Sequence, residues 1–308
     1  MNFPRTGRSR ALSFSPLIGI LVVAATAGCG SMRHERTDPK IWTWSGELKA
    51  PATLHLRNLN GEITVRPSPD STVRVTASAR WRRGNPKSDL KFNVVNAGSD
   101  VTVCVLWTSG VCTATEYSMN TDLWQKFFKA RGTDATVGLT IFVPAGVRVD
   151  ASTVNGSVNI LATAPVKART VNGSIKVGTA VGPVDAESLN GGVDIRMTTL
   201  DGPGAVRAAT INGSASAFLP EKFDATVDIA ATNGRAGSEF TIPGASVDGG
   251  AKTLAGTVGT GGREVHITTI NGSAWLRRLN ADGSVGAGAG AVAPTAATTP
   301  ARSAKPLR

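Results

Sequence analysis

The sequence predicts an all-β fold: a β-solenoid, or β-helix, of short repeats that turn at Asn-Gly pairs, with an irregular N-terminal β cap containing one short helix. Three observations lead to this prediction. Glycine provides 35 of the 308 residues and aromatic residues only 5%, a composition that suits short strands and tight turns. Asn-Gly pairs recur through the second half of the chain in one frame. The residues beside them alternate between apolar and polar, the period of a half-buried strand.

Residues 1–28 have the pattern of a signal peptide. Three arginines within the first ten residues precede an apolar run of twelve, from Leu17 to Gly28. Twelve residues are too few to span a bilayer, which takes about 20 residues, but they suit the apolar region of an export signal. We therefore expect an exported chain.

The leader ends in Ala27-Gly28-Cys29, which resembles the lipobox of bacterial lipoproteins, where the cysteine is lipidated and becomes the mature N-terminus. This resemblance implies lipidation at Cys29, a linker over residues 29–40, and anchoring to the bacterial envelope at the outer membrane or periplasmic face. Thr26 stands where that box usually has leucine. Ordinary cleavage that leaves Cys29 unmodified is the alternative.

Residues 41–140 form the predicted N-terminal β region and cap. Within them, Thr121–Arg131 has one apolar face and a threonine at its start, which predicts a short helix. Cys104 and Cys112 flank a short turn between two β-type runs, so they can meet across a hairpin. In an oxidising envelope this pair is expected to form a disulfide. Two buried thiols are the alternative.

Residues 141–279 contain the repeats. Each repeat has one Asn-Gly pair within a similar sequence, such as STVNGSVNI, RTVNGSIKV or TTINGSAWL. Successive Asn-Gly pairs are 17, 18, 22, 21 and 38 residues apart. The segment TLAGTVG, with Ala255-Gly256 in place of Asn-Gly, divides the longest gap and predicts a seventh repeat. Because Asn-Gly tolerates the backbone angles of a tight turn, the pairs are expected at the turns: Asn155-Gly156, Asn172-Gly173, Asn190-Gly191, Asn212-Gly213, Asn233-Gly234 and Asn271-Gly272.

Stacking makes equivalent residues neighbours, so each position should form a row across the strands. Small or branched residues stand four and two positions before each Asn, and we expect both rows to face the core. At the position five residues before each Asn, acidic and basic residues alternate from one repeat to the next. This alternation favours attraction between neighbouring strands. That series is Asp150, Lys167, Asp185, Arg207 and Asp228, then Gly250 and His266.

The segment PAGVRVDASTVNGSVNI, with its echoes TVNGSIKV and TINGSA and the earlier LNGEITV, is similar to the bacterial β-strand-repeat family labelled "putative adhesin". The resemblance covers about residues 45–279. It implies a β-solenoid and an envelope location, and it brings no catalytic residues. Residues 280–308 are low in complexity and are predicted to be disordered.

Charge and residue distribution exclude several functions. The formal net charge is +11, but residues 41–279 hold 24 basic and 19 acidic side chains, so we expect no nucleic-acid partner. The three histidines show no ligand spacing near a cysteine, which argues against a metal site. The acids are scattered along the repeats rather than paired, and serines lack a histidine partner. We therefore predict no enzyme and no cofactor.

Trp81, Arg82 and Arg83 form the candidate ligand face, because aromatic rings beside arginines suit glycans or anionic polymers. The alternative is that these residues are part of a buried cap, with the aliphatic portions of the arginine side chains lying along its apolar surface. The sequence does not distinguish the two. The predicted function is a non-catalytic, adhesin-like binding or scaffolding lipoprotein. Its partners would be the membrane, through the lipid, and cell-wall polysaccharide or an envelope protein. A regulatory or sensory envelope-stress component is the alternative, and a polysaccharide-processing β-helix enzyme is the third candidate.

Overall fold

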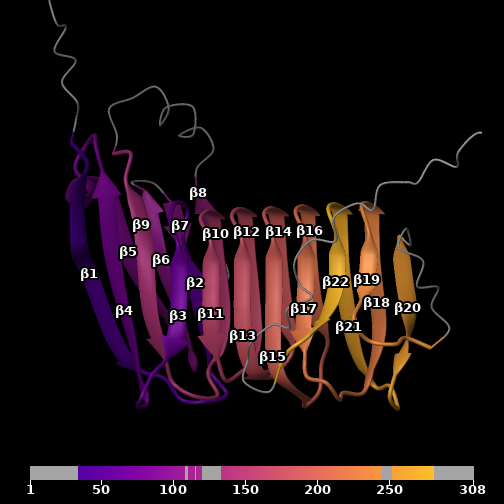
Figure 1. Ribbon diagram of the computed structural model, residues 1–308. Helices are drawn as coiled ribbons and strands as arrows, with labels where there is room; N and C mark the ends of the chain where they lie inside the picture. Colours follow the sequence, from indigo (N-terminus) through magenta and orange to yellow (C-terminus); the bar gives the residue numbers. More distant parts are fainter. Residues whose placement is uncertain (1–33, 108–109, 115, 120–132, 244–251, 281–308) are drawn as a thin grey trace, which may run out of the picture. The chain divides into compact units, whose positions relative to one another are not determined.

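The strands pair into two large sheets. The computed structural model describes residues 34–107, 110–114, 116–119, 133–243 and 252–280 (Figure 1). Apart from one short helix, every regular element in these residues is a strand, so the all-β prediction is confirmed. The signal peptide, Cys29, the predicted helix over Thr121–Arg131 and the C-terminal tail lie outside the described residues.

Each large sheet has ten strands. Sheet A contains, in spatial order, β1 (Arg36–Glu47), β4 (Thr72–Trp81), β9 (Thr136–Val143), β3 (Ile63–Pro67), β11 (Val158–Ala162), β13 (Ile175–Val181), β15 (Val193–Asp201), β17 (Ala215–Leu219), β22 (Ala274–Arg278) and β19 (Ala236–Ser238). Sheet B contains β20 (Thr253–Val258), β18 (Ala225–Asn233), β21 (Arg263–Asn271), β16 (Val206–Asn212), β14 (Val184–Asn190), β12 (Val166–Asn172), β10 (Arg148–Asn155), β2 (Thr53–Arg57), β6 (Asp100–Trp107) and β5 (Leu90–Ala97).

Most neighbouring strands run parallel, and the antiparallel pairs lie toward the ends of the sheets. These are β1–β4 and β4–β9 in sheet A, and β5–β6 and β18–β20 in sheet B. A separate two-stranded sheet pairs β7 (Gly110–Cys112) with β8 (Tyr117–Met119). The helix α1 (Pro86–Asp89) starts at Asn85, whose side chain accepts a hydrogen bond from the Lys87 N–H, with proline at its first position.

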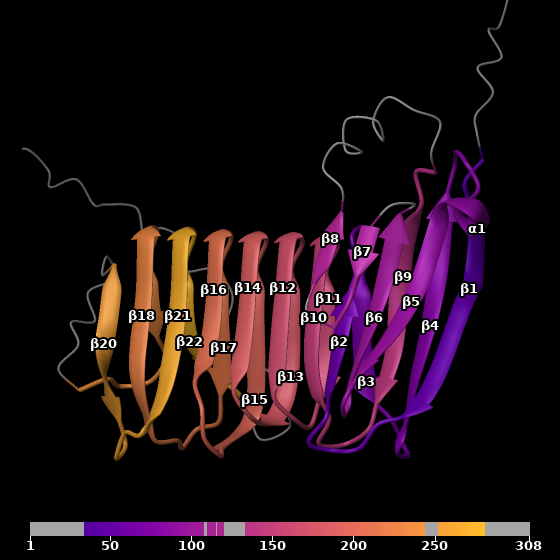
Figure 2. The same ribbon diagram turned by 180° about the vertical axis from the view of Figure 1, so that it is seen from behind.

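The repeat region alternates between the two sheets. A strand of sheet B ends at an Asn, the Asn-Gly turn follows, and the next strand joins sheet A. We call such a pair of strands a repeat unit; β10–β11, β12–β13, β14–β15 and β16–β17 are four of them. Figures 1 and 2 show these strands as two layers, and one hydrophobic core cluster contains buried side chains from both sheets.

The six Asn residues of the repeats stack into a ladder. In the spatial order 155, 172, 190, 212, 271, 233, each side-chain amide after the first donates to the amide oxygen of the preceding Asn, at 2.7 to 2.9 Å. The turns stack as well, because the N–H of Gly156 donates to the Asn172 carbonyl and later glycines repeat this contact. Register is therefore identical in all six units.

The inward rows follow the predicted positions and show why threonine and serine recur two residues before Asn. The hydroxyls of Thr170, Ser188 and Thr210 donate at 2.8 to 2.9 Å to the carbonyl oxygen of the turn glycine in the preceding unit. These side chains are buried, and each buried polar group needs a partner. The row satisfies the turn carbonyls rather than only filling space.

Two predictions about the C-terminal end are wrong. The segment TLAGTVG does not form a seventh repeat unit: it is β20, which pairs antiparallel with β18 and leaves the expected inward Thr253 exposed. The last units also do not stack in chain order. Unit β21–β22 lies between β16–β17 and β18–β19, so Asn271 stands between Asn212 and Asn233.

Candidate functional site

The outer face of sheet B carries three rows of side chains, which the Asn register aligns. The charged row, five residues before Asn, runs in space as Asp150, Lys167, Asp185, Arg207, His266 and Asp228. The middle row, three residues before Asn, is Ser152, Arg169, Glu187, Ala209, Thr268 and Ala230. The aliphatic row, next to Asn, is Val154, Val171, Leu189, Ile211, Ile270 and Thr232.

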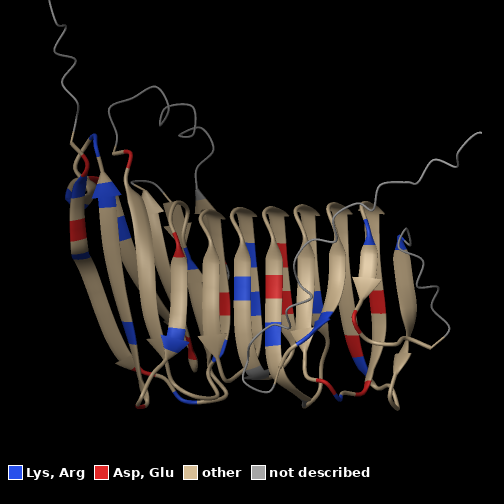
Figure 3. Cartoon of the chain, viewed as in Figure 1, with Lys and Arg blue, Asp and Glu red and all other residues tan. Residues whose placement is uncertain are grey.

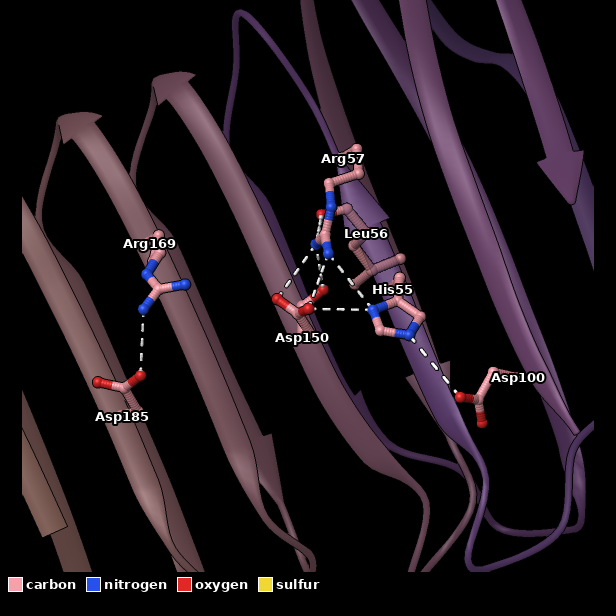
Figure 4. A network of polar contacts seen from close by, with 7 residues as sticks. All are labelled: His55, Leu56, Arg57, Asp100, Asp150, Arg169 and Asp185. Carbon is pink, nitrogen blue, oxygen red and sulfur yellow. Dashed lines mark hydrogen bonds and ion pairs between the residues drawn. The ribbon is translucent and has the colours of Figure 1, made fainter. Parts of the chain in front are cut away.

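Asp150 on β10 is the centre of a polar network at one end of the charged row (Figure 4). Its carboxylate accepts two hydrogen bonds from the Arg57 guanidinium, at 2.7 and 3.1 Å, and lies 3.0 Å from Nδ1 of His55. The other ring nitrogen of His55 lies 3.9 Å from an Asp100 oxygen. The network joins β10, β2 and β6 across the strands.

Burial acts to raise the pKa of Asp150, but the Arg57 hydrogen bonds and charge, with His55, outweigh it and hold that pKa below its usual value. Asp150 is therefore a charged, fully engaged carboxylate at neutral pH. Arg57 also donates to the Asp150 and Leu56 carbonyl oxygens. The Asp150 carboxylate and the Arg57 guanidinium are hydrogen-bonded to each other and are not free to act on a substrate. The pair is therefore better suited to linking two strands than to acid–base catalysis.

The predicted alternation of charge does not pair neighbours as expected. Arg169, from the middle row, makes the ion pairs with Asp185 at 3.3 Å and Glu187 at 2.9 Å. Lys167 and Arg207 take part in no ion pair within the part of the chain that the structure describes. Arg207 lies next to His266 rather than Asp228, because the last units exchange places. Arg169 reaches Asp185 diagonally, from the middle row to the charged row, whereas Glu187 is its direct partner on β14. In the charged row itself, His266 lies 3.6 Å from its direct partner Asp228.

The aliphatic row lines an open groove of about 810 Å³ on the same face. Four of its side chains are substantially exposed, at 36% to 43%: Val171, Leu189, Ile211 and Ile270. Arg169 and Glu187 line the other side of the groove. A continuous row of exposed aliphatic side chains is unusual on a protein surface and indicates a contact surface.

Tyr117, on the β7–β8 hairpin, also lines the groove. The disulfide Cys104–Cys112 ties the hairpin to β6, and the Tyr117 hydroxyl donates to the Val105 carbonyl oxygen at 3.0 Å. Burial raises the pKa of Tyr117 well above its usual value, so the hydroxyl stays protonated as a donor. The predicted disulfide is confirmed. The two cysteines do not face each other within one hairpin, however, because β7 pairs with β8.

The candidate ligand face at Trp81 is partly buried. Trp81 packs against the core, and so do Trp42 and Trp44. The main-chain N–H groups of Arg82 and Arg83 both donate to Asp134 at 2.8 Å. The Arg83 side chain is 65% exposed, and its Nε lies 3.7 Å from a carboxylate oxygen of Asp134. The structure thus brings these residues together around Asp134, in an arrangement that favours their interpretation as cap residues.

Arg57, His55 and Asp100 were not predicted as a group from the sequence. Arg57 was detectable, because it stands three residues before Asn60, as Arg169 does before Asn172. His55 was detectable in the same way, because it stands five residues before Asn60, as Asp150 does before Asn155. Asp100 has no such signal, since β6 pairs with β2 through a long-range contact. No group of three or more metal-ligating side chains occurs among the described residues. Within the same residues, no helix is both long and apolar enough to cross a membrane.

The chain matches no protein-family model and no curated protein. Among solved structures it is similar to a "putative cell adhesion protein" from Clostridium sporogenes ATCC 15579. The two chains are 12% identical, the match covers 77% of this chain and 99% of the other, and the TM-score is 0.34. A likeness at this level carries no conclusion about function.

Proposed function

We propose that this chain is a non-catalytic, adhesin-like binding or scaffolding protein of the bacterial cell envelope, and that its repeats form a β-solenoid presenting one flat face to a partner. The observation that carries the proposal is the row of exposed aliphatic side chains in the groove on sheet B. Leaving such side chains in water costs about 25 cal/mol per Å² of apolar surface, which contact with a partner recovers.

The strands beneath the groove contribute side chains but no free backbone edge. In the interior of sheet B, β12, β14 and β16 each pair with a strand on both sides. A partner can therefore add apolar and charged side-chain contacts, with Arg169 and Glu187 at the rim, but it cannot add a strand here. This chemistry favours a surface of another envelope protein.

The envelope location is supported by the disulfide, because disulfides persist in oxidising compartments and are rare in the bacterial cytosol. The lipid anchor at Cys29 and the membrane contact it provides are part of the proposal. The alternative function, a regulatory or sensory envelope-stress component, uses the same groove through protein contacts. The two differ in the phenotype that follows when the partner is lost.

The test uses the full-length chain, purified from the envelope, and isolated envelope fractions with and without protease treatment. At a salt concentration that suppresses retention by charge, we expect the fractions to retain the chain, and protease treatment to abolish retention. Leu189→Asp with Ile211→Asp should reduce it at least tenfold. Val181→Asp on sheet A is the matched control, because Val181 is also an exposed aliphatic residue, at 43%, and lines neither the groove nor the hollow around Gly178 on sheet A.

Equal retention of the groove variant and the wild type would contradict the groove as the binding surface. Release of reducing sugar ends in the same tubes would overturn the non-catalytic assignment. If the binding holds, a strain that carries the groove variant separates the two functions. Loss of surface attachment alone fits an adhesin, whereas an altered stress response fits a regulator.

A further inference from the structure

The outer face of sheet A has a row of its own, six residues beyond the turn Asn except at Phe142, and the row ends at Glu239, which lies 3.9 Å from Arg277. In register it runs Phe142, Arg66, Leu161, Gly178, Arg196, Phe218 and Arg277. Basic residues alternate there with apolar ones, and one position is a glycine. Figure 3 shows basic and acidic positions spread over the strands of this face.

Around Gly178 this face is hollowed, with a volume of about 700 Å³. Phe142 and Leu161 lie on one side and Arg196 on the other, and Arg66 and Lys176 complete the basic lining. A side chain at Gly178 would first meet the flexible end of Leu161, at 3.0 Å, and no backbone atom closer than 3.9 Å. The glycine is therefore not required by the backbone, and its effect is to keep the hollow open.

The three cations of the hollow are exposed and make no direct contact with a carboxylate of the described chain. Among the described residues, Arg66, Lys176 and Arg196 form no ion pair and no hydrogen bond to a carboxylate. Arginines elsewhere on the surface do form such pairs, as Arg74 does with Asp70 at 2.6 Å. Arg196 instead stacks over the Phe218 ring at 5.2 Å.

Asp194 is the one carboxylate among the residues that line the hollow. Burial raises its pKa, even though Arg196, Lys176 and Arg277 act in the opposite direction. With Asp194 ionised, the three cations leave a net charge of about +2 in the lining. The amide of Asn159 donates to Glu62 at 2.6 Å, so it is already occupied.

We propose that this hollow binds an acidic carbohydrate polymer through its carboxylate or phosphate groups. Guanidinium groups bind both anions in a forked geometry, and lysine adds a point charge. Arg66 and Arg196 lie three strands apart in sheet A, which is roughly 14 Å at the usual strand spacing. That separation exceeds one small anion, so a ligand that contacts both arginines must carry more than one charged group. Leu161, which lies between them, contacts the sugar rings.

The site lies on the opposite sheet from the groove, so it goes beyond the proposed function and does not depend on it. The experiment measures binding of the full-length chain to polygalacturonate, to poly(glycerol phosphate), to neutral dextran and to a single-stranded DNA oligonucleotide. We expect binding to one or both acidic carbohydrate polymers, weakened at high salt, and none to dextran. The two acidic polymers distinguish carboxylate from phosphodiester recognition.

Arg66→Gln with Arg196→Gln should weaken binding at least tenfold. The matched control is Lys167→Gln with Arg207→Gln, which removes the same charge from unpaired cations on sheet B and should change affinity less than twofold. Gly178→Leu fills the hollow and should also weaken binding at least tenfold without loss of charge. Asp194→Asn should strengthen it severalfold, an effect that misfolding does not produce.

Equal weakening by the control pair would overturn the site, because attraction by net charge alone predicts it. Unchanged binding of Gly178→Leu, or equal binding of dextran, would overturn it as well. DNA binding as tight as that of the acidic carbohydrates would overturn the carbohydrate assignment. The groove variants on sheet B leave this hollow intact, so failure here is distinguishable from failure of the proposed function.

Discussion

The four units from β10 to β17 and the C-terminal end from β18 to β22 use the same repeat frame with different outcomes. In the first group, units stack in the order in which the chain makes them. In the second, β21–β22 takes the place next to β16–β17, and β18–β19 lies farther out. Both regions share the Asn ladder and the inward rows without a break.

This difference shows that the repeat frame specifies register but not neighbours. Any unit with Asn at the turn and small residues facing inward can pair with any other. At the C-terminal end, the 38 residues between Asn233 and Asn271 include β20, which pairs along the outer edge of β18. Because β20 already pairs with that edge of β18, no further strand can pair there. The last unit can then occupy the interior place, where strands of sheet B flank β21 on both sides.

The largest expected effect comes from cross-linking across the exchanged units. Ala209→Cys with Thr268→Cys should form a disulfide in full yield, because the two residues are direct partners on β16 and β21. Ala209→Cys with Ala230→Cys should form none, because β21 lies between them and places them about 10 Å apart. Mass spectrometry under non-reducing conditions distinguishes the two. A bridge only in the second pair would restore chain order and refute the exchange.

The next effect concerns the turn glycines of the central units. A Cβ at Gly191 would collide with the carbonyl oxygen of Gly173, so Gly191→Ala should lower the free energy of unfolding by about 3 kcal/mol or more. Gly262, between β20 and β21, has φ +104° and no atom within 4 Å of a Cβ. Gly262→Ala should cost about 1 kcal/mol from backbone strain alone. Urea unfolding followed by circular dichroism measures both. Similar losses would mean that the stacked turns do not constrain the backbone.

The pH dependence of stability should also differ between the two regions. The pKa of Asp150 is lowered in the folded chain, so its contribution is present above about pH 4, the ordinary value for aspartate, and is lost as pH falls through the lower folded value. Asp150→Asn should therefore cost about 2 kcal/mol at pH 7 and progressively less as the pH falls below about 4. Asp228→Asn, at the C-terminal end, should cost about 0.5 kcal/mol or less. Unfolding midpoints measured from pH 2 to 7 test this, and a pH-independent loss for Asp150→Asn would contradict it.

The smallest effect separates the middle of the Asn ladder from its end. Asn190 both donates to Asn172 and accepts from Asn212, whereas Asn233 makes one ladder bond, to Asn271. Asn190→Ala should cost about 1 kcal/mol and Asn233→Ala about half of that, because these amides are exposed. Thermal unfolding resolves the difference. Equal costs would indicate that each Asn acts only through its own turn.

Much of the fold was accessible because it depends on local chemistry. The Asn-Gly turns and the inward rows follow from residues a few positions apart, and the Cys104–Cys112 disulfide joins residues eight positions apart. The seventh repeat was wrong for a physical reason: TLAGTVG has the alternation of a strand, but it forms an edge strand in which Leu254 is buried and the other side chains are partly or fully exposed. Alternation of apolar and polar residues predicts that a segment forms a strand, but not which strand it pairs with.

The candidate sites were less accessible than the fold. The groove needs six strands in one register, and its exposed aliphatic row looks in the sequence like any strand position. The ion pairs were misjudged, because Arg169 of the middle row reaches Asp185 diagonally and pairs with its direct partner Glu187. The hollow on sheet A depends on Gly178 standing between Leu161 and Arg196, two neighbours that come from other repeats.

The sequence by itself determined the all-β class, the turn positions, the inward rows and the disulfide, since each depends on residue type and short spacing. Only the tertiary structure decided the order of the last two units, the tie between Asp150, Arg57 and His55, and the two outer faces with their groove and hollow. The physical reason is that identical repeats have nearly equal pairing energies. Which units become neighbours, and which side chains gather on a face, is settled only when the whole stack and its covered edges form.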